Sequence, residues 1–193
     1  MYSPFVLIVI SILIAAFHMI APDHWLPLTT ISMKRGYKRK RVLLISAVLG
    51  FLHGLTSVLL SFFALFIGVV FFGINALKGL SILIPIIVAI YMFIQTVRER
   101  RISKTVENTS LAVSIFPDPI LIPIIIAPYQ LGNLVVGIIG ISFILTSTLA
   151  LLAVTKGILI GVGRKLSNLK PVTVDYLIII ALILTAIYVY FFS

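Results

Sequence analysis

The sequence predicts an all-α membrane protein in which six transmembrane helices form two inverted three-helix repeats with proline-broken helices. Three observations support this fold class: an apolar composition, a one-sided placement of basic residues, and a motif that recurs in the second half. The 193 residues are 61% hydrophobic and 10% charged, with a mean hydropathy of +1.26. A soluble domain needs more polar surface than this composition supplies.

Six apolar runs approach or exceed the roughly 20 residues that a helix needs to cross a bilayer. The predicted spans cover 4–22, 42–72, 79–97, 112–130, 132–161 and 174–193. The first run follows no basic segment, so it is interpreted as a span and not as a cleavable signal peptide. The chain then divides into a first repeat over 1–97, a cytoplasmic linker over 98–111 and a second repeat over 112–193, which together form a single membrane domain.

The basic residues predict the orientation of the spans. They follow the first, third and fifth spans: Lys34, Arg35, Lys38, Arg39, Lys40, Arg41, Arg98, Arg100, Arg101, Lys104, Lys156, Arg164, Lys165 and Lys170. Of all Lys and Arg residues, Lys78 alone falls on the other side. Because basic loops stay cytoplasmic, both termini are expected outside the plasma membrane. The net charge of +10 is thus a topology signal, and no nucleic-acid partner is expected.

A motif recurs between the two halves. The stretch APDHWLPLTT (21–30) is echoed by FPDPILIPII (116–125), and each is followed by a glycine-containing span. Those spans carry the matching pairs Thr56-Ser57 and Thr146-Ser147. An odd number of spans per unit turns the second unit upside down relative to the first. Inverted repeats with broken helices are typical of transporters.

Prolines at membrane depth predict where helices break. Pro22 has no N–H to bond the carbonyl of His18, and its ring clashes with that carbonyl. Polar backbone freed by a break is tolerated inside a membrane only when it is buried in protein or lines a cavity. Helix breaks are predicted at Pro22, Pro27, Pro117, Pro119 and Pro123.

Ionisable side chains gather near the first predicted break. The three histidines of the chain, His18, His24 and His53, all lie in apolar segments, and so do Asp23 and Asp118. Burying an Asp at the bilayer centre costs about 2.5–3.5 kcal/mol, so such residues are functional candidates. Imidazole and carboxylate together suit transition metals such as zinc, iron and nickel.

The predicted metal ligands are His18, Asp23, His24 and His53. In an unbroken helix His18 and His24 would point about 240° apart, so they would not share a face. A break at Pro22 would turn both toward one point, and His53 would complete the site from the second span.

Structural roles remain open for several of these residues. His53 alone could simply hydrogen-bond a neighbouring helix, and Asp23 could cap the helix that follows it. Asp118 before Pro119 carries the same capping signal. Hydroxyl residues that could line a substrate pathway with Asp118 also serve commonly in helix packing. These hydroxyl residues are Thr56, Ser57, Thr146 and Ser147.

The motif His18-x4-Asp23-His24 resembles the signature of the nickel–cobalt transporter families within the LysE-type transporter superfamily. FLHGLTSVLL (51–60) resembles their second-helix motif, and SIFPDPILIP (114–123) resembles the turn that opens their second half. The resemblance implies a divalent metal ion as substrate, nickel or cobalt first, with zinc as a further option. The chain departs from the pattern in the linker 98–111, which has no histidine, and at Asp118, where a cysteine is usual.

The function expected from these features is a secondary transporter, not an enzyme, that moves the ion by alternating access between the lipid-embedded repeats. Three alternatives stay open: an exporter of a small anion, an intramembrane metalloenzyme with Asp23 as base, and a structural subunit. The absence of cysteine excludes thiol chemistry. The direction of transport, the coupling ion and a homodimeric state are not determined by the sequence.

Overall fold

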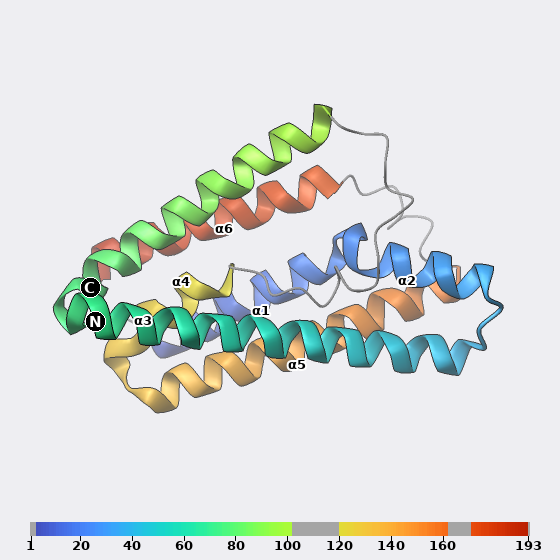
Figure 1. Ribbon diagram of the computed structural model, residues 1–193, viewed down its shortest axis with the longest axis horizontal. Coiled ribbons are helices and arrows are strands. Elements are labelled where there is room, and N and C mark those ends of the chain that lie inside the picture. Colours follow the sequence, from blue (N-terminus) through green and yellow to red (C-terminus); the bar gives the residue numbers. More distant parts are fainter. Residues whose placement is uncertain (1–2, 102–119, 162–170, 193) are drawn as a thin grey trace.

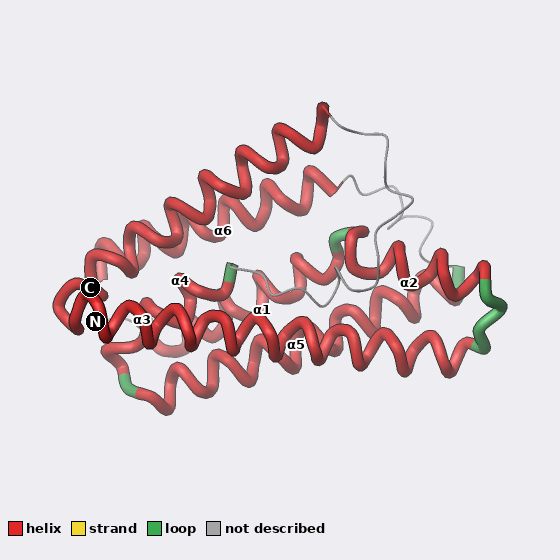
Figure 2. The backbone as a smooth tube through the Cα atoms, viewed as in Figure 1, coloured by secondary structure: helices red, strands yellow, loops and turns green. Residues whose placement is uncertain are grey.

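The computed structural model describes residues 3–101, 120–161 and 171–192, which are helical almost throughout and contain no strand (Figure 2). The α-helices are α1 (Pro4–Ile20), α2 (Pro22–Lys34), α3 (Arg39–Arg101), α4 (Leu121–Ile126), α5 (Asn133–Leu159) and α6 (Pro171–Phe192), with a 3-10 helix, η3 (Ala127–Leu131), between α4 and α5. The predicted all-α class is therefore confirmed for these parts of the chain.

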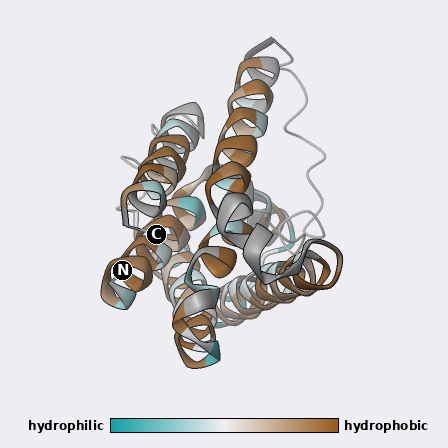
Figure 3. Ribbon diagram, turned by 90° about the vertical axis from the view of Figure 1, so that its left-hand side faces the viewer, coloured by the Kyte–Doolittle hydropathy of each residue, from teal (hydrophilic) through white to brown (hydrophobic). Residues whose placement is uncertain are grey.

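Two helical stretches are long and apolar enough to cross a membrane. They are Arg39–Phe71 of α3 and Asn133–Leu159, and only 33% of the most apolar part of each is buried inside the protein. Shorter apolar helices cover Pro4–Ile20 and Ile82–Ile94. Large apolar side chains point outward, with Phe66 64% exposed and Leu149 63% exposed, and Figure 3 shows hydrophobic residues along most of the helices. Exposed apolar surface of this kind is typical of a face that a membrane or another protein covers.

The helix α3 consists of two arms that meet at Gly73. This residue has φ 72° and ψ 167°, a conformation that glycine adopts at little steric cost. The chain reverses direction there (Figure 1). The predicted spans 42–72 and 79–97 fall within the two arms, and a single glycine with positive φ makes the reversal between them.

The fourth predicted span, 112–130, is described only from residue 120 onward. That part consists of the six-residue α4 and the five-residue η3, which ends at Gly132 with φ 100°. The break predicted at Pro123 is wrong, because α4 runs through this residue. Pro123 is the third residue of α4, in the first turn, where a missing N–H removes no helical hydrogen bond.

The antiparallel pair α3 and α5 forms the centre of the bundle, and glycines let the two backbones approach closely. A Cβ atom on Gly50 would lie 2.9 Å from the carbonyl oxygen of Ser147, and one on Gly54 would lie 2.9 Å from the Cα of Ile144. Small residues permit such contacts between membrane helices. Around this pair, α1 packs against α5, and α4 packs against α3.

Buried apolar side chains form two separate clusters. The large cluster joins α1, α3, α4, α5 and α6, and includes Leu7, Ile14, Val58, Leu65, Ile139 and Phe143. The small cluster joins α1, α2, α3 and α5, and consists of Met19, Trp25, Leu28, Val42, Leu49, Leu151 and Val154. The polar residues described below lie between these two clusters along the chain.

The close approach of α3 and α5 predicts that Gly54→Ala destabilises the protein by about 1–3 kcal/mol, the usual range for overpacking. The new methyl group would meet the backbone of Ile144, which cannot rotate away. Thermal unfolding in detergent, followed by circular dichroism, measures the effect. Gly137→Ala on α5 is the control, because nothing lies within 4 Å of a Cβ there. Equal melting temperatures for the two variants would contradict this packing.

Candidate metal centre

Three histidines from three helices meet inside the bundle. His18 lies in the last turn of α1, His24 in the first turn of α2, and His53 in the first arm of α3. The Nε2 atoms of His18 and His24 are 2.9 Å apart, and one ligand atom from each of the three residues lies within 4.8 Å of the others. All three side chains are buried, with 8%, 4% and 1% of their surface exposed. We call this group the histidine triad.

A break between α1 and α2 produces the approach of His18 and His24. The first helix ends at Ile20, Ala21 is extended with φ −58° and ψ 138°, and α2 begins at Pro22. The break predicted at Pro22 is therefore confirmed. Proline suits the first helical position, because its missing N–H would have no partner there.

Hydrogen bonds inside the protein satisfy the backbone groups at the break. The Ala21 N–H donates to the His18 carbonyl over 3.1 Å, and the His24 N–H donates to the Ala21 carbonyl over 3.4 Å. The indole Nε1 of Trp25 donates to the Ile20 carbonyl over 3.0 Å. Ala21 at the break is buried, and hydrogen bonds within the protein satisfy the backbone groups there.

The break predicted at Pro27 is wrong, because α2 continues through this residue to Lys34. A proline inside a helix removes one N–H donor and pushes a carbonyl aside. Pro27 is the sixth residue of α2, so the helical bond that it removes is the one to the Asp23 carbonyl, and the helix continues without it. One turn further on, the hydroxyl proton of Thr29 is shared between the carbonyls of Trp25 at 2.9 Å and Leu26 at 3.1 Å.

His53 closes the triad from the opposite side. Its ring centroid lies 5.3 Å from that of His18 and 4.8 Å from that of His24, and the centroids of His18 and His24 are 4.6 Å apart. On the same helix, the hydroxyl of Thr56 donates to the His53 carbonyl over 3.0 Å. Thr56 therefore supports the backbone of a triad residue.

The other predicted hydroxyl residues lie along the contact between α3 and α5. Ser57 and Ser147 are both fully buried, whereas Thr146 is half-buried. The Oγ of Ser147 makes no hydrogen bond with any residue that the structure describes. Of this set, Ser147 alone combines deep burial with a hydroxyl that lacks such a partner, so it stays a candidate for the substrate pathway.

Apolar side chains flank the polar positions on both sides along each helix. On α1, Ile14 of the large cluster precedes His18, and Met19 of the small cluster follows it; the same change of cluster occurs around His53 on α3 and Ser147 on α5. The triad and Ser147 thus form a polar layer between two apolar regions. This layer is closed to solvent, because its members are almost completely buried.

The structure leaves the two predicted carboxylates undecided. Asp23 is the second residue of α2, so it lies in the first turn and not at the N-cap. Ligation of a metal by its side chain stays a prediction. Asp118, with Pro117 and Pro119, lies outside the described residues.

The donor set fits a transition-metal ion. Ions of the zinc type bind imidazole nitrogen at about 2.0–2.1 Å, so tetrahedral ligands lie roughly 3.4 Å apart. The present nitrogen separations bracket that value, from 2.9 Å for His18 and His24 up to 4.8 Å across the group. Small side-chain rotations would therefore bring three nitrogens to one ion and leave a fourth position open.

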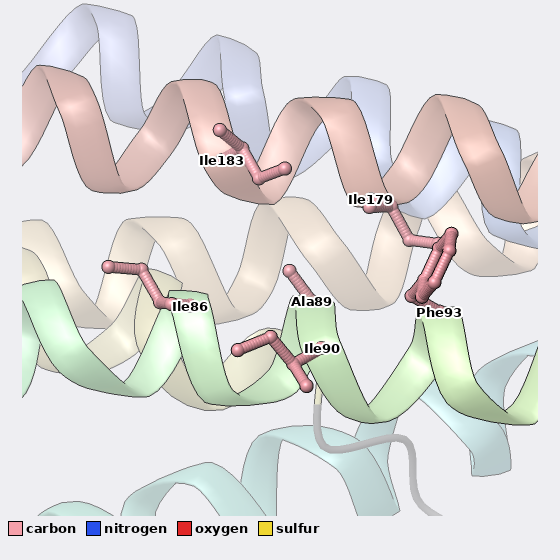
Figure 4. A pocket seen from close by; sticks show the side chains of 6 residues that line it. All are labelled: Ile86, Ala89, Ile90, Phe93, Ile179 and Ile183. Atoms are coloured by element: carbon pink, nitrogen blue, oxygen red, sulfur yellow. The ribbon is translucent and has the colours of Figure 1, made fainter.

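An apolar groove elsewhere in the protein offers no ligands. It lies between the second arm of α3 and α6, has a volume of about 200 Å³ and is lined by Ile86, Ala89, Ile90, Phe93, Ile179 and Ile183 (Figure 4). No lining side chain carries a polar atom, so the groove has no part in the ion chemistry.

Some features of the centre have no counterpart among the predicted residues. Trp25 bridges the break, and the hydroxyl of Ser46 donates to that of Thr155 over 3.0 Å, joining α3 to α5. The two glycines four positions apart, Gly50 and Gly54, are a signal for close helix packing that the sequence carries openly. The roles of Trp25 and Ser46 carry no such signal.

No family model, curated protein or solved structure matches this chain.

The geometry of the triad predicts that Zn²⁺, Ni²⁺ or Co²⁺ stabilises the purified protein. An ion at 100 times its Kd adds about 2.7 kcal/mol to a folded state that alone binds it. Thermal unfolding in detergent should show a rise in Tm that His53→Ala removes and Ser61→Ala retains. An equal rise in a variant without all three histidines would place the bound ion elsewhere.

Proposed function

We propose that this protein is a secondary transporter of divalent transition-metal ions, with the histidine triad as the ion site within the membrane. Nickel and cobalt are the proposed substrates, and zinc is chemically suited to the same site. The observation that carries the proposal is the meeting of three buried imidazoles whose ligand atoms lie within 4.8 Å of one another.

Chemistry inside a membrane favours this function. Ionisable side chains are rare at such depth and commonly mark ion pathways. Imidazoles must be deprotonated to bind a metal, so protonation of the triad would release the ion. The open fourth position would let water or another ligand accompany the ion as it enters and leaves. No enzymatic step belongs to the proposal.

The contacts between the halves support inverted repeats. A shift of 90 residues places Thr56-Ser57 on Thr146-Ser147, and it also places Gly54 on Ile144. The close contact between Gly54 and Ile144 then joins equivalent positions of the two repeats. The packing between the halves is reciprocal: α1 of the first repeat packs against α5 of the second, and α4 of the second repeat packs against α3 of the first. Such repeats commonly rock against each other to give alternating access.

The two proposed repeats contribute unequally to the ion site. Within the glycine-containing spans, the shift of 90 residues that aligns the two Thr-Ser pairs places His53 on Phe143, a fully buried member of the large cluster. An apolar ring therefore stands where the second repeat would carry its own ligand. This supports one ion site, built by the first repeat, and not a symmetric pair.

The arrangement of turns supports a six-span topology in the plasma membrane with both termini outside. The turns at Gly73 and Gly132 lie at the same end of the bundle as both termini, and the loop at 35–38 lies at the opposite end (Figure 1). Residues Lys38 to Arg41 are exposed at that opposite end. Under the positive-inside rule this end faces the cytoplasm.

The proposed transport predicts that His24→Ala slows the flux of Ni²⁺ or Co²⁺ into proteoliposomes by more than about tenfold, since even outer-shell partners of a metal can matter that much. Flux is read from a metal-sensitive dye inside the vesicles. Thr96→Val is the control, because Thr96 lies in the second arm of α3, is not a member of the triad, and donates its hydroxyl to the Met92 carbonyl. Unchanged flux in His24→Ala would refute the proposal. Anion flux that survives loss of all three histidines would favour an anion exporter instead.

The proposed topology predicts opposite labelling of two single-cysteine variants, which is simple to test because the chain has no cysteine. In intact cells a membrane-impermeant thiol reagent should label Asn133→Cys and leave Lys38→Cys unlabelled until the cells are opened. Both native residues are exposed. Labelling of Lys38→Cys in intact cells would invert the orientation, and the cysteine-free parent measures the background.

A further inference from the structure

We propose that Trp25 is a positioning residue for the histidine triad. The hydrogen bond from its indole N–H to the Ile20 carbonyl, called the clasp below, holds α1 and α2 at the angle that brings His18 and His24 together. This inference rests on the proposed function, because its consequence is the affinity of the triad for a metal ion. Trp25 is not proposed as a metal ligand, because its one side-chain nitrogen donates its N–H to the Ile20 carbonyl.

The clasp spans the break directly. Trp25 follows His24 in α2, and its Nε1 donates over 3.0 Å to the carbonyl of Ile20, the last residue of α1. The extended residue Ala21 lies between the two helices. Trp25 is 3% exposed, so the hydrogen bond is shielded from competing donors. A bond from one side of a break to the other fixes the angle between the two helices.

The Ile20 carbonyl, which accepts the Trp25 hydrogen bond, lies at the C-terminal end of α1. The last carbonyls of any α-helix lack partners within the helix. A side-chain donor that reaches one of them both satisfies it and holds the donor's own helix in place. In apolar surroundings a carbonyl without a hydrogen-bond partner is unfavourable, because it has lost its bond to water. The Trp25 indole is therefore favoured in this one position.

Apolar packing anchors the chain neighbours of both histidines in one place. Met19 follows His18, Trp25 follows His24, and both side chains belong to the small cluster. Leu49 of α3 and Leu151 of α5 complete the surroundings. Packing beside each histidine holds its backbone in place, which limits the positions that each imidazole can reach. Tryptophan combines the required apolar area with one donor, and Trp25 is the sole tryptophan of the chain.

The variant Trp25→Phe tests the clasp, because it keeps an aromatic ring in the small cluster and removes the N–H. Binding of Zn²⁺ and Ni²⁺ to the purified protein in detergent is measured by calorimetry. We expect the Kd to rise about tenfold, in the range for outer-shell partners of metal ligands. In the metal-free protein, hydrogen exchange of the backbone amides of Ala21 and Asp23 to Trp25 should accelerate.

The matched control is Leu28→Ala, which removes volume from the same cluster and leaves the indole bond in place. Leu28 is 1% exposed, so the change should lower Tm. We expect its Kd to stay within about threefold of the parent, although its stability is lower. A Trp25→Phe protein with the Kd and amide exchange of the parent overturns the clasp, and so does an equal loss of affinity in Leu28→Ala. If the parent binds neither ion, the proposed function fails, and amide exchange alone decides the clasp.

Discussion

The break between Ile20 and Pro22 is the constraint on which the rest of the site depends. His24 is six positions after His18, and a continuous helix would direct the two rings to different faces. With Ala21 extended, their Nε2 atoms lie 2.9 Å apart. The same break leaves backbone groups without helical partners in a buried part of the protein, so the protein must satisfy them itself. It does so with local amides and one indole.

A second constraint, the close contact of α3 and α5, fixes the position of the remaining histidine. Gly54 brings α3 against the backbone of α5, and His53 is its neighbour in sequence. The polar layer is then confined between a large and a small apolar cluster. Such an enclosed site lowers the competition from water for any group that binds there, and it also means that access requires movement of one cluster.

The sequence was sufficient for the helical class, for most helix bounds to within a few residues, and for the break at Pro22. These features depend on composition, on the length of apolar runs and on the missing N–H of one proline. The errors at Pro27 and Pro123 arose because a proline near the start of a helix removes at most one helical hydrogen bond, so α2 and α4 continue through these residues. The approach of the three histidines was predictable; the part of Trp25 was not, because an aromatic residue in an apolar run resembles ordinary core. Ligation by Asp23 and Asp118 stays a prediction.

The location of the sole tryptophan has a practical consequence. All indole fluorescence of this protein originates one residue from His24, in a buried setting beside the break. Paramagnetic ions quench nearby fluorophores, and the emission wavelength of an indole responds to local polarity. The native chain therefore carries its own optical reporter beside the histidine triad, which responds to changes in the surroundings of the break without an attached dye.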